Sequence, residues 1–335
     1  MKKTFLLMLF ALTAMVGESF AQNSQVATLN HEGNISTYYG SDAFMNAYTM
    51  SADGDVIALS GGSFNVSNLV LSRGITIRGA GMKADASLGT LPTTLVGDFT
   101  LNNTSGLSIE GIYHDGILKF STSVSPRFIK CRLNIFRPTV STSTVSDAHF
   151  IHCKIAGSLY LKSNCTATCI NSVVNDPRSD ESGNNTYYGR FIFTNCYLFT
   201  NSPFIKSSVF TNCIIDDMYN TENNVFHSSN VMNYNEGACP TGIDIFAGRS
   251  ETNVAYPNYD NFLGTFFNHD KNIDDQSFYF SSVLHQGADG SQKGIYGGQL
   301  PYSETVTGPR ITSASVDSQT SSSGTLSVDI SVSAQ

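Results

Sequence analysis

A short phrase, Phe128-Ile-Lys-Cys-Arg-Leu133, recurs in altered form along the middle of the chain. The other copies are Phe150-Ile-His-Cys-Lys-Ile155, Ile170-Asn-Ser-Val-Val174, Phe193-Thr-Asn-Cys-Tyr-Leu198 and Phe210-Thr-Asn-Cys-Ile-Ile215. With centres at Cys131, Cys153, Ser172, Cys196 and Cys213, the steps between copies are 22, 19, 24 and 17 residues. A unit that repeats after about twenty residues predicts a solenoid of stacked coils.

The apolar pattern inside each copy predicts a strand. The residues two before and two after each centre are apolar or Thr, so they share one face of an extended chain with the centre. We expect this face to point inward, where small central residues let successive coils stack about 4.8 Å apart. The position just before each centre then points outward, and it holds Lys130, His152, Asn171, Asn195 and Asn212.

The same register extends toward the N-terminus. Further centres are predicted at residues 59, 79 and 111, and the polar excursion from Met82 to Pro92 explains the one long step. Residues 41–50 have apolar residues at helical spacing, which predicts a short helix that caps the open end. The predicted fold is all-β, a solenoid of about eight or more coils with this helical cap.

The start of the chain has the pattern of a secretory signal peptide. Two lysines and an apolar run precede Ser19-Phe-Ala21, so residues 1–21 are predicted to be removed. Residues 22–40 would lead into a β-helix domain over 41–308, and a Ser-rich tail over 309–335 contains one predicted strand. We therefore expect an exported protein, in the periplasm, at the cell surface or secreted.

The composition of the chain argues against some classes of binding partner. Removal of residues 1–21 takes away two lysines and one glutamate and changes the formal net charge from −8 to −9, which argues against nucleic acid. No later apolar run is long enough to span a membrane. Four of the seven cysteines lie at repeat centres, where we expect buried thiols more than disulfides, although Cys165 and Cys169 could pair across a turn.

Three segments near the N-terminus carry a family resemblance. Gly54-Asp-Val-Ile-Ala-Leu59, Gly61-Gly-Ser-Phe64 and Gly74-Ile-Thr-Ile-Arg-Gly-Ala-Gly81 follow the predicted helix. Together with the Asn-Cys repeats, they resemble the right-handed parallel β-helix, or pectin-lyase-like, superfamily. The segment from His285 to Gly298 resembles the closing segment of exported β-helix proteins of Bacteroidetes-type bacteria, most of unknown function. The resemblance covers roughly residues 40–300 and implies fold more than chemistry.

That resemblance raises the question of catalysis. Enzymes of the superfamily use carboxylates on the outer face, either around Ca²⁺ or as acid and base across a glycosidic bond. Asp176, Asp216 and Asp217 are the candidates here, because Asp176 and Asp217 would lie two coils apart, about 10 Å. The catalytic phrases Asn-Thr-Asp, Gly-His-Gly and Arg-Ile-Lys are missing, however. These carboxylates are therefore expected to cap turns.

Two polar segments, 175–190 and 216–237, interrupt the coils, and loops on a rigid scaffold often carry function. The ligand-binding candidates in and beside the first segment are Asp180, Glu181, Tyr187, Tyr188 and Arg190, and Lys206 is a further cation. The sequence predicts a monomeric, non-catalytic scaffold that binds a polysaccharide or cell-surface glycan, with no metal or cofactor. The alternative is a polysaccharide lyase or glycoside hydrolase acting on an acidic glycan through the three aspartates, where Ca²⁺ could take part.

Overall fold

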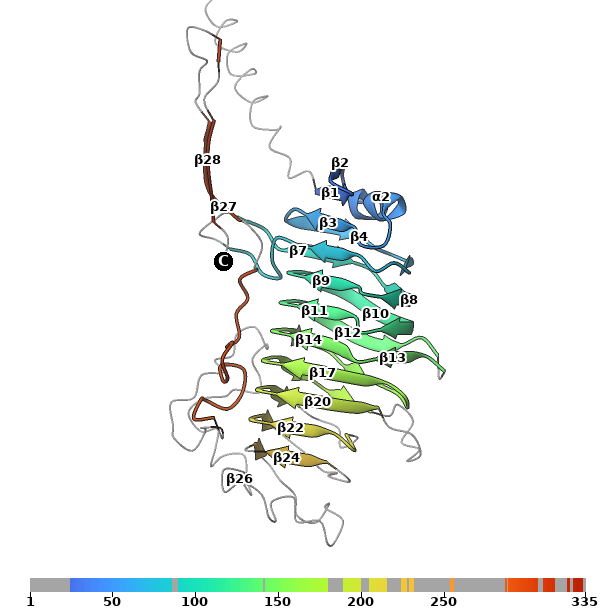
Figure 1. Ribbon diagram of the computed structural model, residues 1–335, viewed down its shortest axis with the longest axis vertical. Coiled ribbons are helices and arrows are strands. Elements are labelled where there is room, and N and C mark those ends of the chain that lie inside the picture. Colours follow the sequence, from blue (N-terminus) through green and yellow to red (C-terminus); the bar gives the residue numbers. More distant parts are fainter. Residues whose placement is uncertain are drawn as a thin grey trace, which may run out of the picture.

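The protein is a parallel β-solenoid of about eight turns, described by a computed structural model. Figure 1 shows its coils stacked along the long axis. The structure describes residues 25–85, 90–140, 142–179, 189–199, 205–215, 224–227, 229–231, 254–255, 287, 289–306, 310–316, 324–325 and 328–333. The signal-peptide prediction lies outside these residues.

Two sheets form the walls of the solenoid. The eleven-stranded sheet contains, in spatial order, β2 (Asn34–Tyr39), β1 (Val26–His31), β3 (Val56–Leu59), β6 (Thr76–Arg78), β9 (Ser108–Glu110), β11 (Arg127–Ile129), β14 (Ala148–Ile151), β17 (Thr166–Ile170), β20 (Arg190–Thr194), β22 (Val209–Thr211) and β24 (Val225–His227). The main path of the fifteen-stranded sheet runs through β4 (Gly62–Asn65), β7 (Thr93–Val96), β10 (Tyr113–Val124), β12 (Arg132–Pro138), β15 (Lys154–Ile155), β18 (Val173–Asn175), β21 (Tyr197–Phe199), β23 (Ile214–Ile215), β25 (Asn230–Val231) and β26 (Val254–Ala255). Its side strands are β5 (Leu69–Leu71), β8 (Phe99–Ser105), β13 (Thr144–Ser146), β16 (Leu159–Tyr160) and β19 (Pro177–Arg178).

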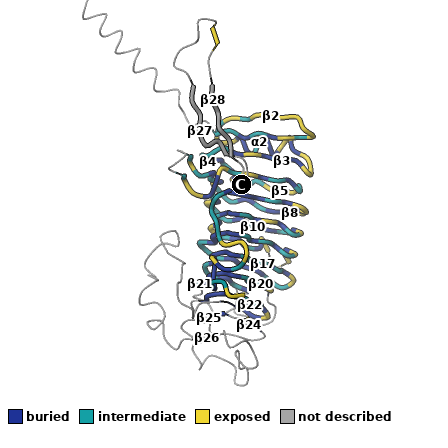
Figure 2. Tube along the Cα trace, turned by 60° about the vertical axis from the view of Figure 1, so that its left-hand side comes forward, coloured by how far each residue is buried: buried dark blue, intermediate teal, exposed yellow. Residues whose placement is uncertain are grey.

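The N-terminal end is closed by a hairpin and a helix. β1 pairs antiparallel with both β2 and β3, so residues before the helix already belong to the eleven-stranded sheet. The predicted helix is confirmed as α2 (Ala43–Met50), which buries Phe44 and Tyr48 against the first coil. Most of the outermost strand β2 is exposed, as the yellow ribbon in Figure 2 shows.

Each repeat phrase forms a corner between the two sheets. Phe128 and Ile129 end β11, Lys130 adopts a φ of 52°, and Cys131 then leads into β12. Phe128 and Cys131 are buried whereas Ile129 is half-exposed, because the single left-handed residue interrupts the alternation of an extended chain. The prediction that the residue two before each centre points inward was therefore wrong. The residue three before the centre takes that place.

The small central column is confirmed. Cys131, Cys153, Ser172, Cys196 and Cys213 are all 0% exposed. The thiol of Cys153 donates to the carbonyl of Phe128 at 3.3 Å, and the hydroxyl of Ser172 donates to the carbonyl of Phe150 at 3.1 Å, so both side chains make the same bond to the coil above. The six described cysteines are free and buried, as expected, and burial raises the pKa of the Cys153, Cys169 and Cys213 thiols well above its usual value.

The spacing of the repeats is also confirmed by strand pairing. Phe128, Phe150, Cys169, Phe193 and Phe210 are paired in succession, which reproduces the steps of 22, 19, 24 and 17 residues. The upstream centres lie one residue later than predicted, because Ile109 pairs with Phe128 and the buried equivalent of Cys131 is Ile112. The excursion from Met82 to Pro92 leaves the corner between β6 and β7, and this accounts for the long step.

The tail forms a sheet of its own. β27 (Arg310–Val316) pairs antiparallel with β28 (Val328–Ser333), so the predicted strand exists but pairs with neither solenoid sheet. Within the described part of the chain, no helix has the length and apolar character needed to cross a membrane.

The corner register predicts unequal losses of stability for two adjacent substitutions. Phe150→Ala should lower the free energy of unfolding by about 3–5 kcal/mol, because its ring packs on Phe128 and Phe136 with centroid distances of 5.1 and 5.3 Å. Ile151→Ala, at the half-exposed neighbour, should cost less than about 2 kcal/mol. Chemical denaturation followed by circular dichroism measures both, and a larger loss in Ile151→Ala would contradict the corner.

Candidate functional site

A C-terminal segment, residues 289–306, runs along the corners of the coils, and we call it the strap. In Figure 1 it is the orange trace beside the stacked strands, between the last coils and β27. It contacts the column of left-handed corner residues, whose φ values are 52° at Lys130, 54° at His152, 45° at Asn171, and 52° at both Asn195 and Asn212. The positions predicted to point outward therefore hold a segment of the same chain.

The lower part of the strap is held by asparagines. The side-chain amide of Asn171 donates to the carbonyls of Ile295 and Gly297 at 2.8 and 2.7 Å. The backbone carbonyl of Asn212 accepts from the N–H of Gly294 at 2.8 Å. Gly298 lies so close to the Asn195 amide that a Cβ would overlap it, which explains one glycine of the Gly297-Gly298 pair.

The upper part is held by ionisable side chains. Lys130 donates from Nζ to the carbonyl of Thr305, and Nδ1 of His152 accepts from the N–H of Ser303 at 3.2 Å. The His152 ring also stacks on Tyr302, with centroids 6.1 Å apart. Lys154 forms an ion pair of 2.6 Å with Glu304.

A second column lies next to the corners, at the first residue of each strand in the fifteen-stranded sheet. Strand pairing aligns Tyr113 with Arg132, and Arg132 with Lys154, on three successive coils. Further along, the paired Val173, Tyr197 and Ile214 are fully buried, and Gly294 of the strap lies against Ile214. The aromatic and cationic end of this column is less covered, because Tyr113 and Arg132 are half-exposed.

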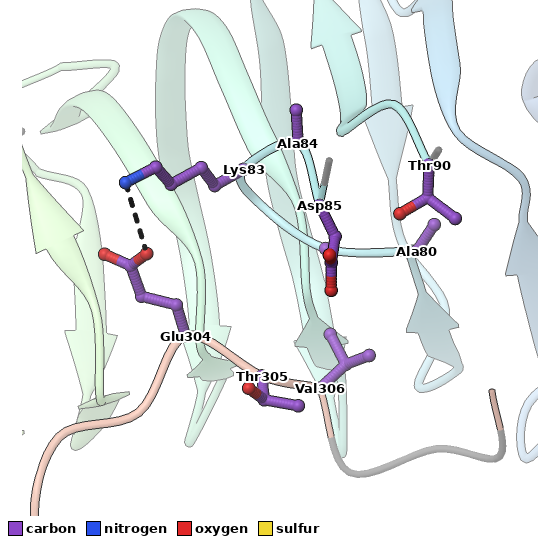
Figure 3. A pocket seen from close by; sticks show the side chains of 9 residues that line it. Ala80, Lys83, Ala84, Asp85, Thr90, Glu304, Thr305 and Val306 are labelled. Atoms are coloured by element: carbon purple, nitrogen blue, oxygen red, sulfur yellow. Dashed lines mark ion pairs between the residues drawn. The ribbon is translucent and has the colours of Figure 1, made fainter. Parts of the chain in front are cut away.

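Two adjoining hollows open at this end, where the strap meets the excursion after β6. One, of about 260 Å³, is lined by Met82, Lys83, Ala84, Pro92, Tyr113, Arg132, Lys154 and Glu304. The other, of about 230 Å³, is lined by Ala80, Gly81, Lys83, Ala84, Asp85, Thr90, Glu304, Thr305 and Val306. Figure 3 shows the second hollow, with Lys83 reaching from the excursion toward Glu304 of the strap. Lys83, Ala84 and Glu304 separate the two.

Glu304 is the central charge of this site. Its carboxylate faces Nζ of Lys154 at 2.6 Å and Nζ of Lys83 at 3.9 Å, and it accepts from the hydroxyl of Tyr302 at 3.2 Å. Burial, followed by the charge of Glu304, raises the pKa of Tyr302, so this hydroxyl remains a donor. In the first hollow, Arg132 lies over the Tyr113 ring, with its Cζ 4.5 Å from the ring centroid.

The described lining of the two hollows supplies hydrogen-bond donors and charges. Three cations and one carboxylate line the first hollow, and that carboxylate is bound by two lysines and a tyrosine. Among the described residues, no three His, Cys, Asp or Glu side chains come together as metal ligands. The site offers donors that can hold hydroxyl or anionic groups, but its described lining does not present two free carboxylates for acid and base catalysis.

The structure describes one of the three predicted catalytic aspartates. Asp176 follows β18 with a φ of 46°, and its Oδ2 accepts from Ser158 at 2.8 Å and from Nε of Arg178 at 2.7 Å. Its Oδ1 is buried without a hydrogen-bond partner. Asp216 and Asp217 lie outside the described residues, so the predicted cluster stays a prediction.

The predicted ligand-binding residues are described only in part. Arg190 is exposed at the start of β20, where it pairs with Thr166 in the eleven-stranded sheet. Lys206 is buried beyond that strand. Asp180, Glu181, Tyr187 and Tyr188 lie outside the described residues. The described contacts of Asp176 involve Arg178, and they do not include Arg190.

Sequence reasoning missed the residues of the two hollows. A signal was available for Arg132 and Lys154, because both directly follow the central Cys in neighbouring copies of the repeat. Lys83 lies in an excursion that the sequence marks only as polar. Glu304 comes from 150 residues beyond Lys154, and the sequence contains no pattern that would link them.

The Asn171 corner predicts two separable losses. Asn171→Gly keeps the left-handed backbone and removes the two amide bonds, so the protection of residues 295–297 against hydrogen exchange should fall by about 1–3 kcal/mol. Asn171→Ala should lose about 1–2 kcal/mol more in global stability, because alanine resists a positive φ. Hydrogen exchange measures the local loss of protection in the strap, and thermal unfolding measures the loss of global stability. Unchanged exchange of the strap in Asn171→Gly would contradict the contact.

Comparisons of the chain with protein-family models, with curated proteins and with solved structures found no match.

Proposed function

We infer that this protein is an exported, non-catalytic β-solenoid scaffold that binds a glycan in the hollows between the strap and the excursion after β6. The observation that carries the proposal is the first hollow, where Tyr113, Arg132 and Lys154 lie side by side on three coils. Saccharides are bound through hydrogen bonds from a few well-placed polar groups in a concave site. The cations Lys83, Arg132 and Lys154 supply such groups.

The rigidity of the scaffold supports this role. Arg132 and Lys154 begin strands whose next inward residues, Leu133 and Ile155, are buried in the core. A binding site on paired strands needs little ordering when a ligand arrives, which favours affinity. With the strap in place, the opposite wall comes from Glu304 and Lys83, which are joined to each other and to the solenoid by ion pairs.

The contacts of Glu304 and Asp176 support binding over cleavage. Glu304 is paired with two lysines, and Asp176 is bound by Arg178 and Ser158. A general acid needs a carboxyl group placed to give a proton to the leaving oxygen, and a partner carboxylate across the bond. The lyase or hydrolase alternative therefore requires Asp216 and Asp217 as its catalytic carboxylates. The export part of the proposal is based on the signal-peptide pattern of residues 1–21.

A matched pair of arginine variants tests the site. Isothermal titration with neutral and uronate-containing oligosaccharides, chosen from a glycan array, should give binding that Arg132→Gln weakens about tenfold or more, since a charged hydrogen-bond donor is lost. Arg127→Gln is the control, because Arg127 is an exposed arginine on the eleven-stranded sheet. Thermal unfolding checks that both variants fold.

The same oligosaccharides test the alternative. Release of reducing ends or of unsaturated products by the wild type, abolished in Asp217→Ala, would replace the binding proposal with an enzyme. Equal affinity of Arg132→Gln and the wild type would show that the glycan binds outside the hollow. No binding across the array would refute the proposed function.

A further inference from the structure

The two halves of the strap are attached by different chemistry. Residues 294–298 are held at asparagine corners through uncharged amide and backbone contacts. Residues 300–306 are held by His152, Lys130 and the ion pair between Lys154 and Glu304, and the N–H of Tyr302 donates to the carbonyl of Ile295 in the lower half at 2.8 Å. We propose that residues 300–306 form a latch that the neutral ring of His152 keeps closed and that protonation of this ring opens, exposing the hollows to ligand.

The geometry at His152 requires a neutral ring. Nδ1 is the acceptor for the Ser303 N–H, and the imidazolium form has two N–H donors and no acceptor. Protonation would therefore place two N–H groups face to face at 3.2 Å. The ring is only 8% exposed and stacks on Tyr302, so water cannot readily replace the lost contact.

Burial and the charge of Lys130 also disfavour a protonated ring. The ionisable groups that face this corner from the coils and from the strap are Lys130, Cys153, Lys154, Tyr296, Tyr302 and Glu304. Burial, and next the charge of Lys130, lower the pKa of His152 from its ordinary 6.5, and they outweigh backbone contacts with Ser303 and Leu300, which act in the opposite direction. Burial and Glu304 raise the pKa of both tyrosines, so they stay neutral in the range where histidine titrates.

The sign of the pH dependence follows from the lowered pKa. A group whose pKa is lower in the closed latch than in the open one stabilises the closed latch. This stabilisation is complete above the ordinary pKa of the group and is lost as the pH falls below that value. The latch is therefore closed above pH 6.5 and weakens progressively below it. Burial lowers the pKa of Lys293 to about 8, so this lysine titrates separately from His152. The latch is therefore tested at pH values below 8.

Opening of the latch would change the hollows directly. Glu304 lines both hollows, and Thr305 and Val306 line the second one. The asparagine corners keep the lower half of the strap in place while this wall moves. The consequence for ligand binding rests on the proposed function, whereas the latch itself can be tested without a ligand.

Hydrogen exchange of the full chain, followed by mass spectrometry between about pH 5 and about pH 7, tests the latch. After correction for intrinsic exchange, the opening of residues 300–306 should increase about tenfold toward the acidic end, as expected for one buried contact. Residues 294–298 should show no such change. Equal opening at both pH values, or opening of both halves together, would overturn the proposal.

Two histidine variants supply the control. In His152→Asn the corner has the residue that occupies three equivalent corners, so the left-handed φ is kept and an amide oxygen can accept from Ser303 without titrating. Its latch should stay closed throughout. His149→Asn, which removes a histidine paired with Asp147 on the exposed face of β14, should retain the wild-type pH dependence. Persistent pH dependence in His152→Asn would overturn the assignment.

Glycan binding separates the two proposals. The oligosaccharide that binds best near pH 7 should bind more tightly near pH 5 to the wild type, and His152→Asn should remove that gain. A latch that opens without any glycan binding at either pH would refute the proposed function and leave the latch standing. If the latch opens and glycan affinity stays the same, the inference that the latch controls ligand access to the hollows would be wrong.

Discussion

The structure depends on one backbone constraint, the left-handed residue at each corner. A single residue with φ near 50° lets the chain leave one sheet and enter the other within three positions, as at Ile129, Lys130 and Cys131. Asparagine tolerates this conformation better than most residues, which explains its presence at three corners. The same turn directs the residue before it outward and the residue after it into the core, so it places the corner contacts and the cysteine column together.

The sequence predicts the solenoid well because its signals are local. Each copy of the phrase carries its own apolar residues, its small centre and its polar corner, so spacing and stacking follow from comparison of neighbouring copies. The register inside each copy could not be derived from alternation alone, since a left-handed residue cannot be recognised from apolarity. Ile129 and Ile151 have the polarity of core residues, yet the corner turns them outward.

The candidate site was beyond sequence reasoning for a different reason. It is assembled by contacts between residues far apart in the chain, such as Lys130 with Thr305 and Lys154 with Glu304. Nothing in the composition of residues 300–306 indicates that they return to coils in the first half of the chain. The loops that the sequence did single out, 175–190 and 216–237, lie largely outside the described residues, and the two hollows lie at the other end of the strap.

The strap also bears on the order in which the chain can fold. Its partners belong to successive coils, from Lys130 to Asn212, and they face it together only when those coils are stacked in register. A coil that slipped by one residue would turn its corner side chain away and leave the strap with a gap. The contacts of the strap therefore stabilise a stack of correctly aligned coils relative to a stack in which one coil has slipped. These contacts thus join five neighbouring corners, from Lys130 to Asn212, in one continuous segment.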